Sequence, residues 1–211
     1  MQQRQLLGPR TQGGFTLVEI SVVLVIIGLL LGGVLKGGEI IDNTKVKNVY
    51  NTYRELTAAA VSHQDRYGAV PGDDNRATTR GLPTGPTAVT NGNGQGYIDG
   101  GTFNCQNGNT ANEACQALYQ LRLGGFVTGT DTSAPNHAYG GRIALARADN
   151  LIAGFARPVS VCFEWLNNKT IRQLETKFDD GTFNTGAIRG NANYATGAAD
   201  GVSVVNTCVA S

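Results

Sequence analysis

The sequence predicts an α+β fold in which one long amino-terminal helix packs on a small antiparallel sheet with long loops. Three features of the chain support this prediction. An apolar run leads into an amphipathic helical pattern, strand-like segments occur only after that pattern, and glycine is abundant, at 29 of 211 residues. Strands that follow a helix without regular alternation are typical of α+β domains rather than of parallel α/β sheets.

The predicted helix begins in an apolar run, "FTLVEISVVLVIIGLLLGG". No charged residue occurs between Ile20 and Leu35. About twenty helical residues rise about 30 Å, which is the thickness of the hydrocarbon core of a bilayer. Arg4 and Arg10 precede the run, and positive charge tends to stay on the cytoplasmic side. We therefore expect residues 15–35 to cross a membrane and the rest of the chain to lie outside the cytoplasm.

A single carboxylate, Glu19, interrupts the apolar run. An acidic side chain in the middle of a membrane helix costs about 3 kcal/mol on insertion scales. A membrane anchor alone has no use for such a residue, although an anchor with an incidental glutamate is the simpler alternative. We expect that Glu19 is retained for a partner that offsets this cost.

The apolar run is followed by an amphipathic pattern over residues 36–70. Its apolar side chains recur at spacings of three, four and seven, which places them on one face of a helix. They are Ile40, Ile41, Val46, Val49, Tyr50, Tyr53, Leu56, Ala60, Val61 and Tyr67. Gly68 is the expected cap, and Pro71 prevents continuation. One helix from Phe15 to about Tyr67 would be about 80 Å long.

Residues 71–211 are predicted to form a globular head. Residues 71–111 are rich in Gly, Pro, Thr and Asn and indicate a long loop. One short helix is expected in "NEACQALYQLRL", with Asn112 as its cap and Gly124 as its stop, and another in "NKTIRQLETKF". Strands are expected in "GRIALA", "RPVSVCFEW" and "GVSVVNTCV".

Four cysteines are present, and none of them has the CxxC spacing. Zinc sites usually need closer pairs, so disulfides are the favoured interpretation. Disulfides persist in oxidising compartments. The cysteines therefore also indicate that the head lies outside the cytoplasm.

The stretch "GGFTLVEISVVLVIIGLLL" resembles the prepilin signature of type IV pilins and of the pseudopilins of type II secretion. The resemblance covers residues 13–35. It implies that a short basic leader, residues 1–14, is removed by a membrane aspartic peptidase after Gly14. It also implies that the new terminal residue, Phe15, is N-methylated, and that Glu19 is kept inside the apolar helix.

The resemblance further implies how the subunits assemble. In a staggered helical bundle, the terminal amine of Phe15 in one subunit can reach Glu19 in another and set the axial register. Burial of about five large apolar side chains per subunit contributes on the order of 10 kcal/mol. The implied partners are identical or related pilin subunits, the prepilin peptidase, an inner-membrane assembly platform, and the membrane before assembly.

The match is weaker after the apolar run. Many members of the family have a proline at the position that Lys36 holds, where the helix bends or melts in the filament. This chain instead has glycine pairs at residues 32–33 and 37–38. Each glycine weakens a helix by about 1 kcal/mol relative to alanine, so a flexible segment is expected near this position.

The carboxy-terminal pair of cysteines resembles the disulfide-closed terminal loop of type IV pilins. We pair Cys162 with Cys208 and Cys105 with Cys115. Of the three possible pairings, this one closes a small loop and a large one, which the chain-entropy model values at about 3 and about 4 kcal/mol. The other two pairings remain open at this point.

Two loops are weak candidates for calcium, and no other cofactor is expected. In "NGNGQGYID", Asn91, Asn93 and Gln95 occupy alternate positions as in a calcium loop, and Asp99 ends the stretch, but amides replace Asp at the alternate positions. A plain Asn/Gly turn is the simpler interpretation. Asp179 and Asp180 could ligate calcium, as carboxylates in pseudopilin loops sometimes do, or could end a helix and begin a turn.

The leading hypothesis is a structural subunit of a type IV pilus-like filament, in the inner membrane as a precursor and then in an extracellular pilus. A pseudopilin of a periplasmic pseudopilus is the nearest alternative, and a minor pilin for adhesion or DNA capture is another. An enzyme is not expected, because His63 and His137 lack any supporting motif. With a net charge of +1 and no basic patch, no nucleic-acid partner is evident.

Overall fold

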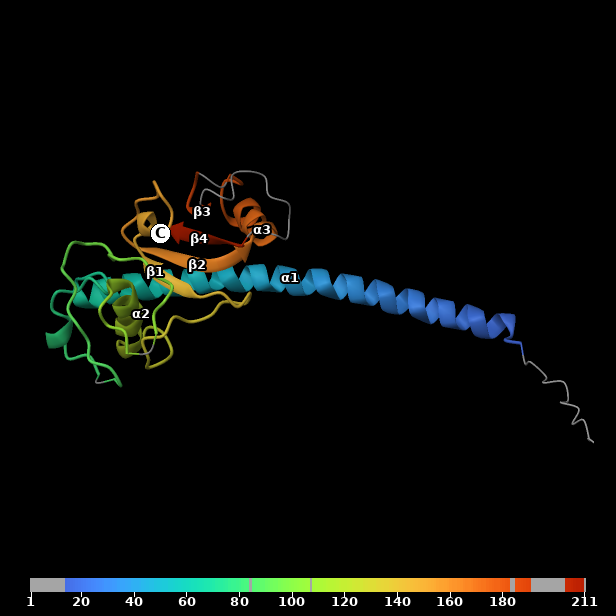
Figure 1. Cartoon of the computed structure of the whole chain (residues 1–211), viewed down its shortest axis with the longest axis horizontal. Coiled ribbons are helices and arrows are strands. Elements are labelled where there is room, and N and C mark those ends of the chain that lie inside the picture. The colour runs from blue at the N-terminus through green and yellow to red at the C-terminus, as the bar shows by residue number, and fades with distance from the viewer. Residues whose placement is uncertain (1–13, 84, 107, 183–184, 191–203, 211) are drawn as a thin grey trace, which may run out of the picture. The chain divides into compact units, whose positions relative to one another are not determined.

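The computed structural model describes residues 14–210 except residues 84, 107, 183–184 and 191–203 (Figure 1). The elements in chain order are the helix α1 (Leu17–Tyr67), the 3-10 turn η1 (Ala77–Thr79), α2 (Glu113–Leu123), β1 (Ile143–Ala146), η2 (Ala148–Asn150), β2 (Ser160–Asn167), α3 (Asn168–Phe178), β3 (Ile188–Gly190) and β4 (Val204–Ala210). The predicted α+β fold class, with a long first helix and a small antiparallel sheet, is confirmed. The chain divides into two compact units, Met1–Asn43 and Thr44–Ser211.

The first unit contains the apolar part of α1. Every large apolar side chain from Phe15 to Leu35 is between 46% and 86% exposed. By length and composition, α1 is apolar enough near its amino terminus to cross a membrane. The helix continues without a break through the glycine pairs on either side of Lys36, which forms an ion pair with Glu39 at 2.7 Å. The glycines therefore remove side chains here but do not interrupt the backbone hydrogen bonds.

The remainder of α1 belongs to the second unit and contributes to its core. Val46, Val49 and Leu56 are buried, whereas Val61, which the periodicity places on the same face, is 47% exposed. The Tyr50 ring stacks on the Phe178 ring at the end of α3, with centroids 3.7 Å apart. α1 ends at Tyr67, as predicted, because Gly68 takes a left-handed conformation with φ of 67°.

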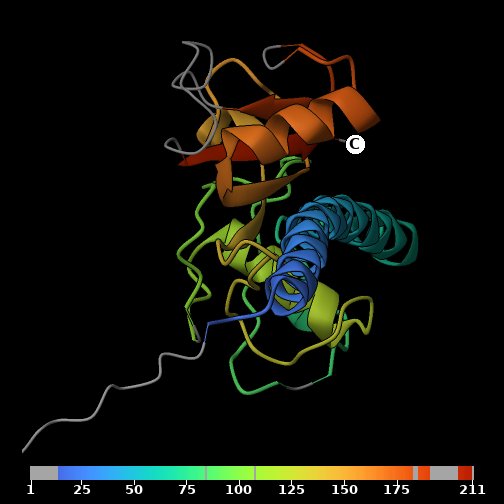
Figure 2. The same ribbon diagram turned by 90° about the vertical axis from the view of Figure 1, so that its right-hand side faces the viewer.

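The sheet has the order β1-β2-β4-β3, and all neighbouring strands are antiparallel. The last strand of the chain, β4, therefore lies between β2 and β3. The short strand β3 was not predicted, because three residues are too few to show an alternating pattern. In Figure 2, α3 lies beside the sheet, and it contacts β2, β3 and β4.

The two faces of the sheet belong to different apolar clusters. Val161 and Phe163 of β2 pack in the main core with the second part of α1, with α2 and with α3. Cys162, which points to the opposite face, packs in a smaller cluster with Phe103, Ile152 and Phe155. This alternation along β2 is the period of two that a strand imposes on its side chains.

Two asparagines start the shorter helices. The Asn112 side chain accepts a hydrogen bond from the Ala114 amide at 2.8 Å, and the Asn167 side chain accepts one from the Thr170 amide at 2.7 Å. Both satisfy donors that the first turn of a helix leaves unpaired. The predicted cap of α2 at Asn112 and its stop at Gly124 are confirmed.

The structure has two disulfides, Cys105–Cys115 and Cys162–Cys208, which are the pairs that the sequence favoured. The first ties the long loop to α2. The second joins β2 to β4 at directly opposed positions of the register. The carboxy-terminal strand is thus held in the middle of the sheet by backbone pairing on both sides and by a covalent bond.

Candidate functional site

The start of α1 is a reciprocal hydrogen-bonded arrangement between Thr16 and Glu19. The Thr16 amide and the Thr16 hydroxyl both donate to the Glu19 carboxylate at 2.8 Å. The Glu19 amide in turn donates to the Thr16 hydroxyl oxygen at 3.3 Å. This is a capping box, in which the residue before the helix and the third helical residue satisfy each other's free amides.

The capping box gives Glu19 a role inside its own chain that the sequence analysis did not identify. The signal was present, because threonine followed three residues later by glutamate before an apolar run is the pattern of a capping box. The carboxylate also stabilises the positive end of the helix dipole. Glu19 nevertheless remains exposed, so its carboxylate is accessible to a group from outside the chain.

Gly14 and Phe15 precede α1 in an exposed segment without regular secondary structure. The Phe15 side chain is 84% exposed. A Cβ added to Gly14 would meet no atom within 4 Å, and Gly14 does not have a positive φ. The described part of the fold therefore does not itself require a glycine at this position.

A family model for the prokaryotic N-terminal methylation motif matches residues 9–35. The chain carries the signature of type IV pilins and pseudopilins. The match includes Gly14, Phe15, Glu19 and the apolar part of α1, and it ends before the second compact unit begins. No curated protein and no solved structure matches the chain.

The pilin signature agrees with the composition of the motif. Its exposed apolar side chains, from Phe15 to Leu35, form a surface that water does not favour. A helix that is apolar on every side is typical of a membrane span or of a buried core. The signature therefore implies a subunit that passes through the membrane and associates with related subunits.

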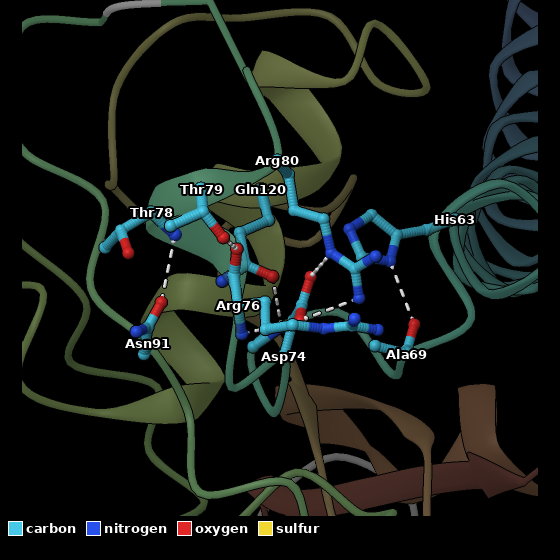
Figure 3. A network of polar contacts seen from close by, with 10 residues as sticks. His63, Ala69, Asp74, Arg76, Thr78, Thr79, Arg80, Asn91 and Gln120 are labelled. Carbon is cyan, nitrogen blue, oxygen red and sulfur yellow. Dashed lines mark hydrogen bonds and ion pairs between the residues drawn. The ribbon is translucent and has the colours of Figure 1, made fainter.

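A second group of polar contacts lies near the carboxy-terminal end of α1, where the long loop begins (Figure 3). Arg80 donates two hydrogen bonds to the buried Asp74 carboxylate, at 2.8 and 3.1 Å. Burial alone would raise the pKa of Asp74, but the hydrogen bonds from Arg80 and from the Arg76 amide outweigh it and hold the pKa below its usual range. This ion pair fixes the turn after Gly68 and is a structural contact.

The two histidines make structural contacts as well. The buried His63 lies within 3.1 Å of the Ala69 carbonyl through Nδ1, and His137 lies within 2.6 Å of the Glu164 carbonyl through Nε2. Since a carbonyl only accepts hydrogen bonds, each of these nitrogens must carry a proton. Burial lowers the pKa of both imidazoles, which are therefore held in the neutral form.

The Asn/Gly loop is organised around a carboxylate from elsewhere in the chain. The amides of Gly94, Gln95 and Gly96 all donate to the buried Asp73, at 2.5 to 2.9 Å. Converging amides form an anion site, and here the anion is a side chain of the protein.

The predicted calcium ligands of this loop hydrogen-bond to backbone amides. Asn91 accepts from the Thr78 amide, Asn93 from the Gln95 amide and Asp99 from the Gly100 amide. Figure 3 shows Asn91 directed toward Thr78. Calcium binding by this loop stays a prediction.

Asp179 and Asp180, the other predicted calcium ligands, lie directly after α3. The structure brings them together with Glu175, so that one carboxylate oxygen from each lies within 4.8 Å of the others. Glu175 was missed because it belongs to a helical pattern in which nothing marks it as buried. Its spacing of four from Asp179 is the only signal that the sequence contains.

Proposed function

We propose that this chain is a structural subunit of a type IV pilus-like filament. The precursor is inserted in the inner membrane by α1, a prepilin peptidase cleaves it between Gly14 and Phe15, and Phe15 is then methylated. The mature subunit leaves the membrane for an extracellular filament by packing its apolar helix against those of its neighbours. The observation that supports this most strongly is the methylation motif over residues 9–35, which coincides with an exposed apolar helix.

The cleavage site follows from two properties of the segment before α1. Gly14 and Phe15 are exposed and lie outside α1, so the bond between them is accessible to a peptidase. Among the residues that the structure describes, no atom near Gly14 requires a glycine there. We infer that the requirement comes from the peptidase, whose pocket would accept no larger side chain there.

Cleavage would create a positively charged partner for Glu19. Removal of residues 1–14 leaves a charged amine on Phe15, next to a helix end that is already positive. In a bundle of staggered helices this amine lies close to Glu19 of a neighbouring subunit, and an ion pair between them would be strong because lipid and water are both excluded. The register of the filament would depend on this pair.

The capping box allows the proposed role to be separated from helix formation. Glutamine can replace glutamate in a capping box, so Glu19→Gln should keep the start of α1 but lose the charge. Glu19→Val should lose both, and Thr16→Val should lose most of the cap but keep the charge. We expect normal processing of all three variants and normal filaments only from Thr16→Val.

The test is to isolate sheared surface filaments from the producing cells, with mass spectrometry of the subunits. We expect an intact subunit that begins at methylated Phe15 and is abundant in long fibres. Recovery only from periplasmic extracts would instead indicate a pseudopilin. The proposal would be contradicted if the isolated subunit kept its first fourteen residues. It would also be contradicted if cells that produce only the Glu19→Gln variant made a full yield of filaments.

A further inference from the structure

Trp165 is the single tryptophan of the chain, and its backbone has a conformation that such residues rarely adopt. Its φ is 60°, and among the described residues it is the only one besides glycines with a positive φ. This left-handed conformation is unfavourable for a bulky side chain. Strain of this kind persists only where the surrounding structure imposes it, and it is concentrated at functional positions.

Trp165 lies in a β-bulge of β2. The register with β4 shifts between Phe163 and Leu166, so that two residues of β2 stand opposite one residue of β4. Phe163 and Leu166 both pack in the main core. Trp165, directly before Leu166, is 53% exposed. The bulge therefore turns the tryptophan away from the core and gives the next core position to a leucine.

Contacts to Glu164, the residue before Trp165, hold the bulge in place. The Glu164 carbonyl accepts a hydrogen bond from His137 Nε2 at 2.6 Å, and the Glu164 amide donates to the Arg142 carbonyl at 2.8 Å. The Glu164 carboxylate forms an ion pair with Arg142 at 3.0 Å. A Cβ at Gly141 would overlap the Glu164 carbonyl oxygen, so the glycine permits this close approach. The surroundings thus impose the conformation that exposes Trp165.

The second compact unit exposes little other large apolar surface. Among the side chains that the structure describes after Thr44, only Val61 and Trp165 are large, apolar and exposed. Tryptophan is enriched among the residues that contribute most to protein–protein binding, where it fills a pocket of the partner. Trp165 therefore has the properties of an anchor for another protein surface.

A hollow of about 360 Å³ lies between the second part of α1 and the segment after α2. Its walls include Glu55, Leu56, Arg122, Phe126, Thr128 and Ile143. Leu56 and Ile143 also belong to the main core, so the hollow lies on the core side of the sheet, from which the bulge turns Trp165 away. Its volume is at the small end of the range of ligand pockets, about 300–1,000 Å³, which suits one large side chain.

The lining of the hollow suits an aromatic side chain in particular. Leu56 and Phe126 offer apolar and ring contacts. The Arg122 side chain is only 7% exposed, and its Nε has no hydrogen-bond partner among the described residues. A guanidinium attracts the face of an aromatic ring, and that of tryptophan most strongly. The exposed Glu55 supplies an acceptor for an indole N–H.

We propose that Trp165 of one subunit occupies this hollow in a neighbouring copy of the chain. The inference rests on the proposed function, in which related subunits stand side by side in a filament. Because the tryptophan and the hollow are different surfaces of one subunit, each subunit offers its tryptophan to one neighbour and its hollow to another. Such a heterologous contact continues from copy to copy and gives a helical array when the rotation does not close a ring.

Filaments sheared from cells that produce a single variant test the role of the tryptophan. Trp165→Gly should lower the filament yield at least about tenfold, because it removes the anchor. The Tm of the full chain in detergent should not fall, because glycine adopts a positive φ without strain. Trp165→Phe keeps an aromatic ring and should retain part of the yield. Val61→Ala, at the other exposed apolar position, is the matched control and should leave the yield unchanged.

The hollow is tested by a variant that fills it from within its own chain. Thr128 lies in the wall of the hollow and is exposed. Thr128→Trp should therefore occupy the hollow and lower the filament yield, with the Tm of the full chain retained. Thr128→Ser is the control and should assemble normally. Normal filaments from Thr128→Trp would overturn the assignment to this hollow.

Photo-crosslinking identifies the two surfaces directly. The aromatic crosslinker p-benzoylphenylalanine, incorporated at position 165, should give a ladder of dimers, trimers and longer species when assembled filaments are irradiated. Mass spectrometry should place the links on the residues that line the hollow. A ladder that ends at dimers would indicate a two-fold contact. That result, or links to another surface or only to other proteins, would overturn the proposal.

Failure of this contact and failure of the proposed function give different results. If the unsubstituted chain forms neither a pilus nor a pseudopilus, both proposals fail. If the unsubstituted chain forms filaments and Trp165→Gly forms them at equal yield, only the contact is overturned. Loss of filaments together with a Tm that falls by more than about 2 °C in Trp165→Gly would show that Trp165 stabilises its own subunit, and would also overturn the contact.

Discussion

The two parts of α1 differ in where their apolar side chains find partners. Between Phe15 and Leu35 every large apolar side chain is exposed. After Thr44 the same helix alternates buried and exposed positions, and Val46 is completely inaccessible to solvent. The first part of this continuous helix thus has an apolar surface that needs a partner outside the chain. The second part buries its apolar side chains against the head.

The difference shows that the interactions that form a helix are separate from those that bury its apolar side chains. Residues of the first part form a helix from backbone hydrogen bonds and the capping box of Thr16 and Glu19. Their apolar surface is left for lipid or for other subunits. In the second part, burial against the head contributes about 25 cal/mol for each Å² of apolar surface removed from water. Substitutions in the two parts should therefore affect different measurements.

The largest effect on filament formation is expected from a charge in the apolar part. Ile26→Arg should cost about 3 kcal/mol in membrane insertion, or about a hundredfold in the insertion equilibrium, and should abolish filaments. The unfolding of the head should not change. Membrane fractionation, filament yield and head unfolding measure this, with Ile26→Leu as the control. Normal filaments from Ile26→Arg would contradict an apolar contact surface at this position.

Removal of the Cys162–Cys208 disulfide should be the largest perturbation of the head. The bond spans 46 residues, and the chain-entropy model predicts a loss of about 4 kcal/mol for Cys162→Ala with Cys208→Ala. The 10-residue Cys105–Cys115 bond should cost about 3 kcal/mol, which makes its double variant the matched comparison. Urea unfolding measures both. A larger loss from the shorter loop would show that strain or packing, rather than loop length, decides.

Leu56→Ala tests whether the buried and exposed sides of the second part of α1 differ in their effect on the stability of the head. Leu56 is 4% exposed and packs in the main core, so its truncation should lower the free energy of unfolding by about 3 kcal/mol. Val61→Ala, on the exposed side of the same helix, should change it by less than about 0.5 kcal/mol. Equal losses from the two variants would mean that Val61 is covered in solution. Membrane insertion should be normal for both.

The smallest effect is expected from the buried histidines. Burial lowers the pKa of His63 and His137, so below about pH 6.5 the unfolded chain binds more protons than the folded chain. Their contribution to stability is therefore full at neutral pH and is lost as the pH falls from about 6.5 toward the lowered pKa. His63→Gln and His137→Gln should flatten this part of the curve of Tm against pH. A steeper fall in either variant would contradict the sign.

Features that depend on neighbouring residues could be predicted from the sequence. The methylation motif, the end of α1 at Gly68 and the cap of α2 at Asn112 all depend on residues within a few positions of one another. Helical periodicity also indicated that Val46, Val49 and Leu56 would be buried. It failed at Val61, because the head covers only part of the face that the pattern defines.

Only two of the three carboxylates at the end of α3 could be identified from the sequence as candidate metal ligands. Asp179 and Asp180 stand out as adjacent acids after a helical pattern, whereas Glu175 resembles any polar residue of an amphipathic helix. Its burial depends on how α3 packs on β2, β3 and β4, and β4 begins only at Val204, far beyond the end of α3 at Phe178. In the same way, Asp73 meets the amides of the Asn/Gly loop more than twenty residues away.

The sequence by itself determined the long helix, its apolar beginning, the processing motif and the α+β class. These follow from composition and from periodicities of a few residues, because they depend on interactions between residues that are close in the chain. The tertiary structure alone decided that β4 lies between β2 and β3, that Glu175 is buried beside two aspartates, and that Asp73 occupies the amides of the loop. Each of these depends on contacts between distant residues, whose free energy appears only when the whole head has folded.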